Sequence, residues 1–453
     1  MLKMTMRGHF HEERKIWGDD EGGTDMKVLL VGGGGREHAI AWKLKQSELL
    51  TELLCAPGNA GIAQIARIFP QIRATDLDAL VALAKEEEVD FVVVAPDDPL
   101  SMGLVDRLEA EGIPAFGPTA AAARIEASKI YSKELMKQYG IPTAAFGTFS
   151  DLEAAEAYIR KMGAPIVVKC DGLALGKGVI VAKTVEEALA GVRSMMLDKS
   201  FGESGANVVI EQCLSGPEVT QLAFLDGEHC VLMPSSMDHK RALDRDEGLN
   251  TGGMGAIAPN PHFTDALRER TIREIVEPTM RMFKEEGIPF KGTLYFGLML
   301  TPDGPSVIEY NARFGDPETQ VVLPLLKSDL LEIMIACREG TLDKLDIRWS
   351  DEKCATVVLA SGGYPGQYET GYPIEGIDHA GEGGAVVFHA GTRDGVAAMD
   401  GATLTAGGRV LAVSAVGGSI AEAVEQAYLA ASCISFEKMH MRMDIGRPSP
   451  LSK

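Results

Sequence analysis

Short apolar runs alternate with amphipathic stretches from residue 26 onward. The run Met26–Val31 predicts a buried strand, and a glycine cluster and a helical stretch at Arg36–Lys45 follow it. Further apolar runs alternate with predicted helices at Thr75–Glu87 and around Gly103–Glu111. Strands that alternate with helices form parallel sheets covered on both faces. This part of the chain therefore predicts an α/β domain.

A different pattern begins near Lys129. The strands PIVVKC and VIVA flank a glycine-rich loop, and three more strands follow without helices between them. The sequences Ser150–Glu153 and Thr184–Glu187 are capping boxes that predict helix starts. A long polar loop is expected at Asp238–Gly255, then a helix at about 264–286 and the strands GTLYFGLML and SVIEYNA. This region predicts a mixed α/β module.

The two ends of the chain differ from its middle. The polar stretch at 345–353 is a candidate linker, and short strands with glycine-rich turns and one capped helix follow it. That pattern predicts a small α+β domain. Residues 1–25 are polar and without period, which predicts a disordered extension. A metal site at His9 and His11 is the alternative for that segment.

Composition narrows the class of protein. At about 150 residues per domain, 453 residues predict about three domains. The net charge of −21, from 65 acids and 44 bases, disfavours nucleic acid and anionic membranes as partners. No apolar run approaches the roughly 18 residues of a membrane span. Seven scattered cysteines without a CxxC spacing indicate reduced thiols in a cytosol.

The glycine cluster Gly32–Gly35 follows the first strand and precedes a helix. Backbone N–H groups without Cβ obstruction at a helix N-terminus form an anion site. A dinucleotide-binding GxGxxG would need a third glycine where Glu37 stands, so a nicotinamide site is disfavoured. The cluster predicts a phosphate site, with a simple tight turn as the alternative.

A second glycine-rich loop, Lys169–Gly178, resembles a P-loop but departs from it. Lys177 precedes glycine instead of Ser or Thr, and a strand follows instead of a helix. A glycine-rich hairpin with a lysine at each end predicts a flap that closes over phosphates. An exposed hairpin with solvated lysines is the alternative.

Two further segments carry chemistry. Glu309 and Asn311 lie two apart on a predicted strand and share a face, and their oxygens suit Mg²⁺. Arg313 offers a planar fork for a carboxylate or phosphate. A half-buried strand edge with surface ion pairs is the alternative. The segments Asp238–Arg241 and Asn250–Gly255 have no apolar period and predict a ligand loop.

Together these motifs resemble the ATP-grasp ligases, and more closely the phosphoribosylamine–glycine ligase (glycinamide ribonucleotide synthetase) family of purine biosynthesis. The resemblance runs in order from Met26 to about Gly446 and covers about nine tenths of the chain. The matching motifs are GGREHA, APGNAG, FGPTA, SK, KCDGLALGKGV, DHKR, NTGGMGA, IEYNARFGDPETQ, GGYPG, FHAGT, GRVL and MDIG.

The resemblance implies a multidomain α/β and α+β fold. A preATP-grasp (Rossmann-like) domain at 26–127 would bind phosphoribosylamine, and an ATP-grasp module would span 128–345 with a flap subdomain at about 148–218. A small α+β domain would span 354–447. The implied reaction ligates glycine to 5-phosphoribosylamine through a glycyl phosphate, with ATP and Mg²⁺ or Mn²⁺. A cytoplasmic monomer or weak dimer is expected.

The resemblance also implies roles for particular residues. Those implied in catalysis are Lys169, Lys177 and Arg313. Those implied to bind ATP are Lys129, Lys169, Gly176, Lys177, Gly178, Glu211, Gln212, Leu214 and Glu218. Those implied to bind the other substrates are Gly33, Gly34, Gly35, Arg36, Glu37, Pro57, Gly58, Asn59, Asp97, Asp238, Lys240, Arg313, Asp316 and Glu318. Glu309 and Asn311 would hold the metal.

The acidic net charge is compatible with a protein that binds ATP, because only a few bases are needed to hold the phosphates and substrates. They would be concentrated in one cleft, while the excess acid coats the outside; they are Lys129, Lys169, Lys177, Lys240, Arg241 and Arg313.

The chain departs from the family pattern at Asp97, Gln212 and Pro217, where glutamate is common, and at Met237, where glutamine is usual. These departures bear on contacts to the ribose and substrates. The strand Leu294–Leu300 carries no acid, which favours the glycine ligase over a biotin-carboxylase-like relative. The rival functions are a formate- or bicarbonate-activating ATP-grasp ligase and a non-catalytic nucleotide-binding regulator.

Overall fold

The computed structural model describes residues 25–173, 178–197, 205–395 and 401–447. Of the residues singled out above, His9, His11, Gly176 and Lys177 lie outside this described part. Within it, no helix is both long enough and apolar enough to cross a membrane.

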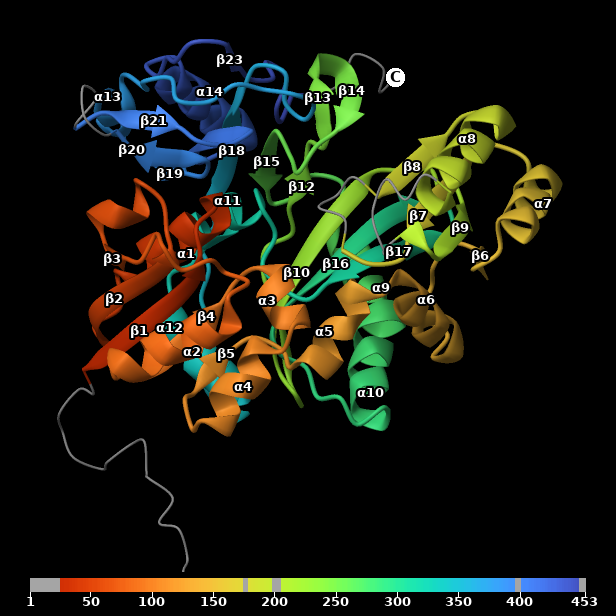
Figure 1. The fold of residues 1–453 in the computed structure, drawn as a ribbon, viewed down its shortest axis with the longest axis horizontal. Helices are drawn as coiled ribbons and strands as arrows, with labels where there is room; N and C mark the ends of the chain where they lie inside the picture. The colour runs from red at the N-terminus through yellow and green to blue at the C-terminus, as the bar shows by residue number, and fades with distance from the viewer. Residues whose placement is uncertain (1–24, 174–177, 198–204, 396–400, 448–453) are drawn as a thin grey trace, which may run out of the picture.

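The N-terminal domain is the predicted α/β sandwich. Its five strands are all parallel and lie in the order β3-β2-β1-β4-β5 (Figure 1). They are β1 (Met26–Gly32), β2 (Leu50–Pro57), β3 (Arg67–Ile68), β4 (Phe91–Val94) and β5 (Ala115–Phe116). The helices are α1 (Gly35–Leu44), α2 (Leu77–Glu86), α3 (Asp97–Ser101), α4 (Leu104–Ala110) and α5 (Ala120–Ala127). The short helix η1 (Ile62–Gln64) follows β2. Helix α6 (Lys129–Gln138) comes after α5 and begins the next region of the chain.

The next region, residues 128–345, which the resemblance assigns to an ATP-grasp module (the ATP-grasp region below), contains two four-stranded sheets. The first has the order β6-β9-β7-β8, with β6 (Phe146–Phe149), β7 (Ile166–Cys170), β8 (Val179–Ala182) and β9 (Val208–Gln212). Helices α7 (Leu152–Met162) and α8 (Val185–Met196) pack on it. The second has the order β11-β10-β16-β17, with β10 (Glu218–Asp226), β11 (Cys230–Leu232), β16 (Lys291–Thr301) and β17 (Gly304–Asn311).

The first of these sheets has a hydrophobic core of its own. Ile159, Val168, Val192 and Ile210 belong to this core, and all of its buried members among the described residues lie between 155 and 210. By contrast, one cluster joins β1 of the N-terminal domain to β10, α12 (Leu330–Glu339) and the C-terminal strands. The sheet β6–β9 with α7 and α8, which stands out at the right of Figure 1, is therefore packed as a separate unit.

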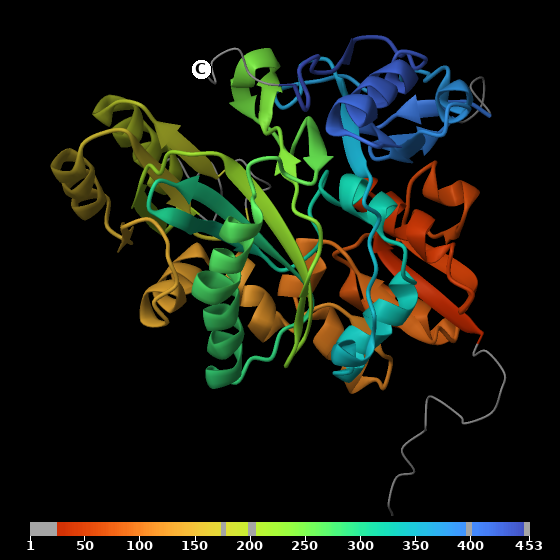
Figure 2. The ribbon, with the colours of Figure 1, turned by 180° about the vertical axis from the view of Figure 1, so that it is seen from behind.

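The remaining helices of the ATP-grasp region flank its second sheet. Helix α9 (Asp265–Thr271) continues through the π-helical turn η4 (Ile272–Val276) into α10 (Glu277–Glu285), which confirms the helix expected at 264–286. Helix α12 packs on β10 and β16 and lies in front of the N-terminal domain in Figure 2. The shorter pieces are α11 (Thr319–Val322), η5 (Leu323–Leu325) and η6 (Leu342–Lys344).

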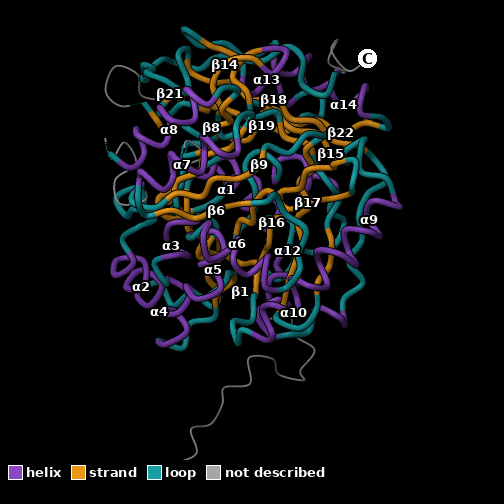
Figure 3. The backbone as a smooth tube through the Cα atoms, turned by 90° about the vertical axis from the view of Figure 1, so that its right-hand side faces the viewer, coloured by secondary structure: helices purple, strands orange, loops and turns teal. Residues whose placement is uncertain are grey.

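The C-terminal domain is built on a six-stranded sheet in the order β12-β15-β18-β22-β19, with β23 beside β18. Figure 3 shows these strands above β16 and β17. The strands are β18 (Lys353–Ser361), β19 (Val386–His389), β22 (Arg409–Gly417) and β23 (Met439–His440). A small ribbon pairs β20 (Thr392–Asp394) with β21 (Thr403–Thr405). Helix α14 (Ile420–Ala431) covers the sheet, and α13 (Ile377–Gly381) is a second, short helix that the sequence did not predict.

Two sequence predictions are wrong. The expected polar loop at Asp238–Gly255 contains β12 (Met237–Asp238), β13 (Arg241–Leu243), η3 (Asp244–Asp246), β14 (Glu247–Asn250) and the start of β15 (Gly255–Ala258). Strands β12 and β15 extend the C-terminal sheet: β12 pairs with β15, and β15 pairs with β18, which lies about a hundred residues further along the sequence. The N-cap of α7 is Asp151, whose side chain accepts from Ala154 N, and not Ser150.

Candidate active site

A buried triad of charges lies between the two sheets of the ATP-grasp region. Lys169, on β7, forms an ion pair with Glu211 at the end of β9 and donates to Ile308 O at 3.1 Å. Lys133, on α6, reaches the other oxygen of Glu211 at 2.6 Å and also donates to Thr143 Oγ1. All three charged side chains are at most 4% exposed. The triad ties the separately packed sheet to the body of the molecule.

Four cations converge on Glu309. Burial alone raises the pKa of this carboxyl, but Lys240, Lys169, Lys129 and Arg313 together hold it below its usual value. These four are among the six bases that the sequence analysis placed in one cleft. Lys177 lies outside the described residues, and Arg241 donates to Gly248 O on its own hairpin. Glu309 is therefore an ionised carboxylate in a strongly positive environment.

Arg313 is anchored by a buried acid that the sequence analysis missed. Its Nη2 lies 3.0 Å from Glu126 Oε1, and Glu126 Oε2 accepts from Ala312 N at 2.6 Å. Asp97, at the start of α3, adds to the negative field around both groups. The Nε atom of Arg313 is buried and has no acceptor among the described atoms. Among the described residues, this guanidinium therefore has one buried donor without a hydrogen-bond acceptor.

A buried acceptor, Asp238 Oδ1, also lacks a partner among the described atoms. Burial together with the charge of Glu318 raises the pKa of Asp238 well above its usual value. Glu318 Oε1 lies 3.1 Å from Thr220 Oγ1, which is 2.9 Å from Tyr295 Oη. A cation placed beside Asp238 would offset the cost of burying its charge.

The glycine loop before α1 lies where the sequence predicts it, beside the segment Pro57–Asn59. A Cβ at Gly33 would be 2.5 Å from Gly58 O, so only glycine permits this approach. Asn59 Nδ2 donates to Gly33 O at 2.9 Å. The N–H of Gly34 donates to Glu37 Oε2 at 2.6 Å, and Arg36 pairs with Glu37 and donates to Phe314 O.

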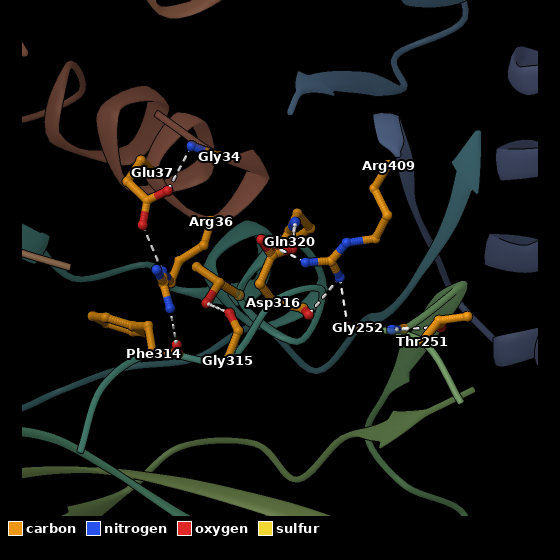
Figure 4. Close-up of polar contacts among 12 residues, drawn as sticks. Gly34, Arg36, Glu37, Thr251, Gly252, Phe314, Gly315, Asp316, Gln320 and Arg409 are labelled. Carbon is orange, nitrogen blue, oxygen red and sulfur yellow. Dashed lines mark hydrogen bonds and ion pairs between the residues drawn. The ribbon is translucent and has the colours of Figure 1, made fainter. Parts of the chain in front are cut away.

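Asp316 joins this loop to the C-terminal domain (Figure 4). Its carboxylate accepts from Gln320 Nε2 at 2.7 Å and from Arg409 at 3.1 Å. The backbone N–H of Arg36 also donates a hydrogen bond to it. Burial raises the pKa of Asp316, but Arg409 and Arg36 outweigh it and hold this pKa below its usual value. The helix N-terminus predicted to bind phosphate is thus contacted by protein carboxylates in this structure.

The remaining residues predicted to bind ATP make contacts near the flap loop and the hinge. Lys129 Nζ donates to Gly172 O at 2.8 Å, and Gly178 O accepts from Cys170 N across the base of the flap loop. Lys240 pairs with Glu218 at 2.8 Å. The hinge residues Gln212 and Leu214 line an open pocket of about 450 Å³ together with 142–144 and 301–306.

Two buried histidines join the N-terminal and C-terminal domains. His389 N donates to His38 Nδ1 at 2.7 Å, and His389 O accepts from Asn59 Nδ2 at 2.8 Å. Burial, and then His389, lowers the pKa of His38 to about 3. Burial lowers the pKa of His389 to about 4. Both rings are therefore still neutral at pH 6.5, which is the ordinary pKa of a solvated histidine side chain.

We expect acid to unfold the protein through these histidines. The unfolded chain binds more protons below pH 6.5, so stability falls by about 1.4 kcal/mol per pH unit per histidine as the pH drops towards 4. His38→Asn retains an acceptor near the position of Nδ1 but does not titrate, so its slope should be smaller by about that amount. Denaturant titrations between pH 7 and 4 measure this slope of unfolding free energy against pH. The control is His379→Asn, because His379 is exposed. Equal slopes for His38→Asn and wild type would contradict the assignment.

Sequence reasoning missed four functional candidates in this region. They are Glu126, Lys133, Tyr295 and Arg409. Only Lys133 carried a local signal, because it lies one helical turn after Lys129 on α6 and shares its face.

The fold and this constellation define an ATP-grasp protein. The biotin carboxylase domain of 2-oxoglutarate carboxylase from Hydrogenobacter thermophilus has a similar fold, with a TM-score of 0.70 at 17% identity over 92% of each chain. Residues 127–319 match the phosphoribosylglycinamide synthetase ATP-grasp (A) domain. Residues 26–126 and 354–448 match the N domain and C domain of the same synthetase. The chain belongs to the phosphoribosylglycinamide synthetase family.

Individual relatives agree with this membership. The chain is 49% identical to the phosphoribosylamine–glycine ligase of Brucella melitensis over 93% of this chain and 97% of that protein. It is 47% identical to the enzyme of that name from Escherichia coli K12, over 93% and 98%. The crystal structure of phosphoribosylamine–glycine ligase from Thermotoga maritima superposes with a TM-score of 0.79 at 32% identity, covering 92% of this chain and all of that one.

Proposed function

We propose that this chain is the ligase that joins glycine to 5-phosphoribosylamine, producing glycinamide ribonucleotide, ADP and phosphate in purine biosynthesis. Relatives that carry this name match nearly the whole chain and all three of its domains. Membership of an ATP-grasp family makes ATP the energy source. The substrates are small molecules; the cytoplasmic location and the monomeric or weakly dimeric state stay predictions.

The observation that carries the glycine assignment is a pair of unfilled hydrogen-bonding positions. Arg313 Nε is a buried donor and Asp238 Oδ1 a buried acceptor, each without a partner among the described atoms. An α-amino acid zwitterion supplies what both lack, a carboxylate for the guanidinium and an ammonium for the carboxylate. Formate and bicarbonate offer no ammonium, so Asp238 favours glycine over either of them.

The chemistry follows from the poor electrophilicity of a carboxylate. A glycine carboxylate oxygen attacks the γ-phosphorus of ATP, and ADP leaves. The nitrogen of phosphoribosylamine then attacks the carbonyl carbon of the glycyl phosphate, loses a proton and displaces inorganic phosphate, which forms the amide. Both steps bring negative oxygens together, so fixed cations lower the barrier. Lys169, Lys129 and Arg313 are such cations, and we assign Lys177 to the same task from the sequence.

Mg²⁺ or Mn²⁺ would be held by Glu309 and Asn311. The donor set fits these ions, because it offers one ionised carboxylate oxygen and one amide oxygen from a single strand. Within the described part of the chain, Asn311 Oδ1 makes a long contact, 3.4 Å, to Arg313 Nη2. When bound, the ion would neutralise charge on the β- and γ-phosphates of ATP.

We assign the separately packed sheet to the flap that covers ATP. Its own core lets β6–β9 move as a unit about the hinge Gln212–Leu214. Backbone groups of the hinge would receive adenine, and Glu218 would accept from the ribose hydroxyls. Gly176, Lys177 and Gly178 lie between β7 and β8 in the sequence, and we assign them to the part of the flap that would close over the phosphates. Closure would exclude water from the glycyl phosphate.

We assign phosphoribosylamine to the N-terminal domain. Its phosphate would lie at the glycine loop Gly33–Gly35 with Arg36 and the segment Pro57–Asn59. Asp97 would face the sugar. The carboxylates of Glu37 and Asp316 contact the same helix N-terminus, so they would have to share or yield donors there when phosphate binds.

Phosphate release in the presence of ATP and Mg²⁺ tests this function. We expect release that depends on both phosphoribosylamine and glycine, with neither formate nor bicarbonate replacing glycine. Mass spectrometry of the product should give glycinamide ribonucleotide. Release driven by formate or bicarbonate would favour the rival ligases, and no release with any carboxylate would favour the nucleotide-binding regulator.

A further inference from the structure

Two side chains of the C-terminal domain hold the backbone of one residue in the ATP-grasp region, Gly252. Arg409 Nη1 donates to Gly252 O at 2.6 Å, and the N–H of Gly252 donates to Tyr364 Oη at 3.0 Å. A Cβ at Gly252 would lie 3.0 Å from Arg409 Cζ, so the guanidinium packs directly on this glycine. The C-terminal domain thereby fixes the segment that the sequence analysis predicted to be a ligand loop.

The same guanidinium holds a second substrate segment (Figure 4). Arg409 Nη1 also donates to Asp316 O at 2.7 Å, and Nη2 lies 3.1 Å from Asp316 Oδ2. The side chains of Arg409 and Asp316 are only 20% and 19% exposed. Two segments of the ATP-grasp region are therefore joined through one planar group at the base of β22.

These two segments meet at the proposed glycine pocket. A Cβ at Gly253 would lie 2.3 Å from Pro317 Cδ and 2.6 Å from Asp238 Oδ1, the unpartnered acceptor. Gly253 is the neighbour of Gly252, and Pro317 is the neighbour of Asp316. A shift of either segment would therefore change the space beside Asp238 directly. Arg409 does not itself contact Asp238 through any hydrogen bond among the described residues.

We propose that Arg409, assisted by Tyr364, is a positioning residue that sets the shape of the glycine pocket. This inference rests on the proposed function, since it assigns the pocket to glycine. The C-terminal domain thus contributes to recognition of glycine, although Arg313, Asp238 and Glu318 all come from the ATP-grasp region. Lysine cannot replace Arg409, because a single ammonium does not present a planar fork to three acceptors on two segments.

Steady-state kinetics of Arg409→Ala, Arg409→Lys and Tyr364→Phe test the proposal. We expect both Arg409 variants to raise the KM for glycine by about 10-fold to 100-fold, because displacement of a pocket wall by about 1 Å has effects of this size. The KM for ATP should stay within about 2-fold of wild type. Tyr364→Phe should raise the KM for glycine by a smaller factor, since it removes one acceptor. Guanidinium ion at a non-denaturing concentration should partly restore Arg409→Ala.

Arg393→Ala, an exposed arginine of the same domain, is the matched control and should leave all constants unchanged. An unchanged KM for glycine in both Arg409 variants would overturn the proposal. So would an equal rise of all three KM values, or a loss confined to kcat with a lowered Tm, as a purely structural role predicts. If Arg409→Ala does not fold, Arg409→Lys and Tyr364→Phe decide the question. Wild-type enzyme without glycine-dependent phosphate release would instead refute the proposed function.

Discussion

Glu309→Gln should lower kcat/KM for ATP by about 10³-fold at saturating Mg²⁺. The substitution keeps the shape of the side chain but removes the one anion on which Lys240, Lys169, Lys129 and Arg313 converge. Without that carboxylate the strand would lose its ionised metal ligand, and the four cations would repel one another. A loss of this size corresponds to about 4 kcal/mol of transition-state stabilisation.

Glu285→Gln is the control for this variant, because Glu285 is an exposed acid at the end of α10. It should behave as wild type. Binding of Mn²⁺ in the presence of ATP, followed by electron paramagnetic resonance, gives a second measurement that does not depend on turnover. Glu309→Gln with wild-type turnover and wild-type Mn²⁺ binding would rule out Glu309 as the metal ligand.

Arg313→Met should be the most destabilising single substitution in the site and should also weaken the binding of glycine. Glu126 would remain buried without its partner, which costs about 3–5 kcal/mol of folding free energy. The variant would also lose the guanidinium proposed to bind the glycine carboxylate, which should raise the KM for glycine by about 10²-fold. Urea unfolding and glycine kinetics measure the two effects separately.

A double variant separates the two roles of Arg313. Arg313→Met with Glu126→Gln removes both charges, so most of the lost stability should return while glycine use stays impaired. Exposed Arg273→Met is the control for loss of an arginine. If the double variant regained both stability and glycine affinity, Arg313 would have only a structural role.

The sequence could predict the parts of this site that depend on local pattern. The period of two along a strand places Glu309 and Asn311 on one face, and the glycine cluster after β1 marks the start of α1. The alternation of strands and helices predicted the parallel sheet of the N-terminal domain, which the structure confirms. These features need no knowledge of distant partners.

The missed residues depend on partners that are remote in sequence. Arg409 begins an apolar strand, and nothing nearby indicates that it reaches Asp316, 93 residues away. Glu126 lies in an alanine-rich helix typical of a surface, yet it accepts from Ala312, 186 residues away. Strands β12 and β15 are two and four residues long and pair within a sheet completed by β18, so no local period revealed them. Tertiary contacts alone define these features.

The fate of the glycine carboxylate oxygens tests the central claim most directly. Glycine labelled with ¹⁸O in its carboxylate is supplied with ATP, Mg²⁺ and phosphoribosylamine, and the released phosphate is analysed by mass spectrometry. An acyl phosphate route transfers one carboxylate oxygen to each phosphate, so every phosphate formed should carry one ¹⁸O atom. Phosphate without label, released at the same rate as product, would contradict activation of glycine by ATP.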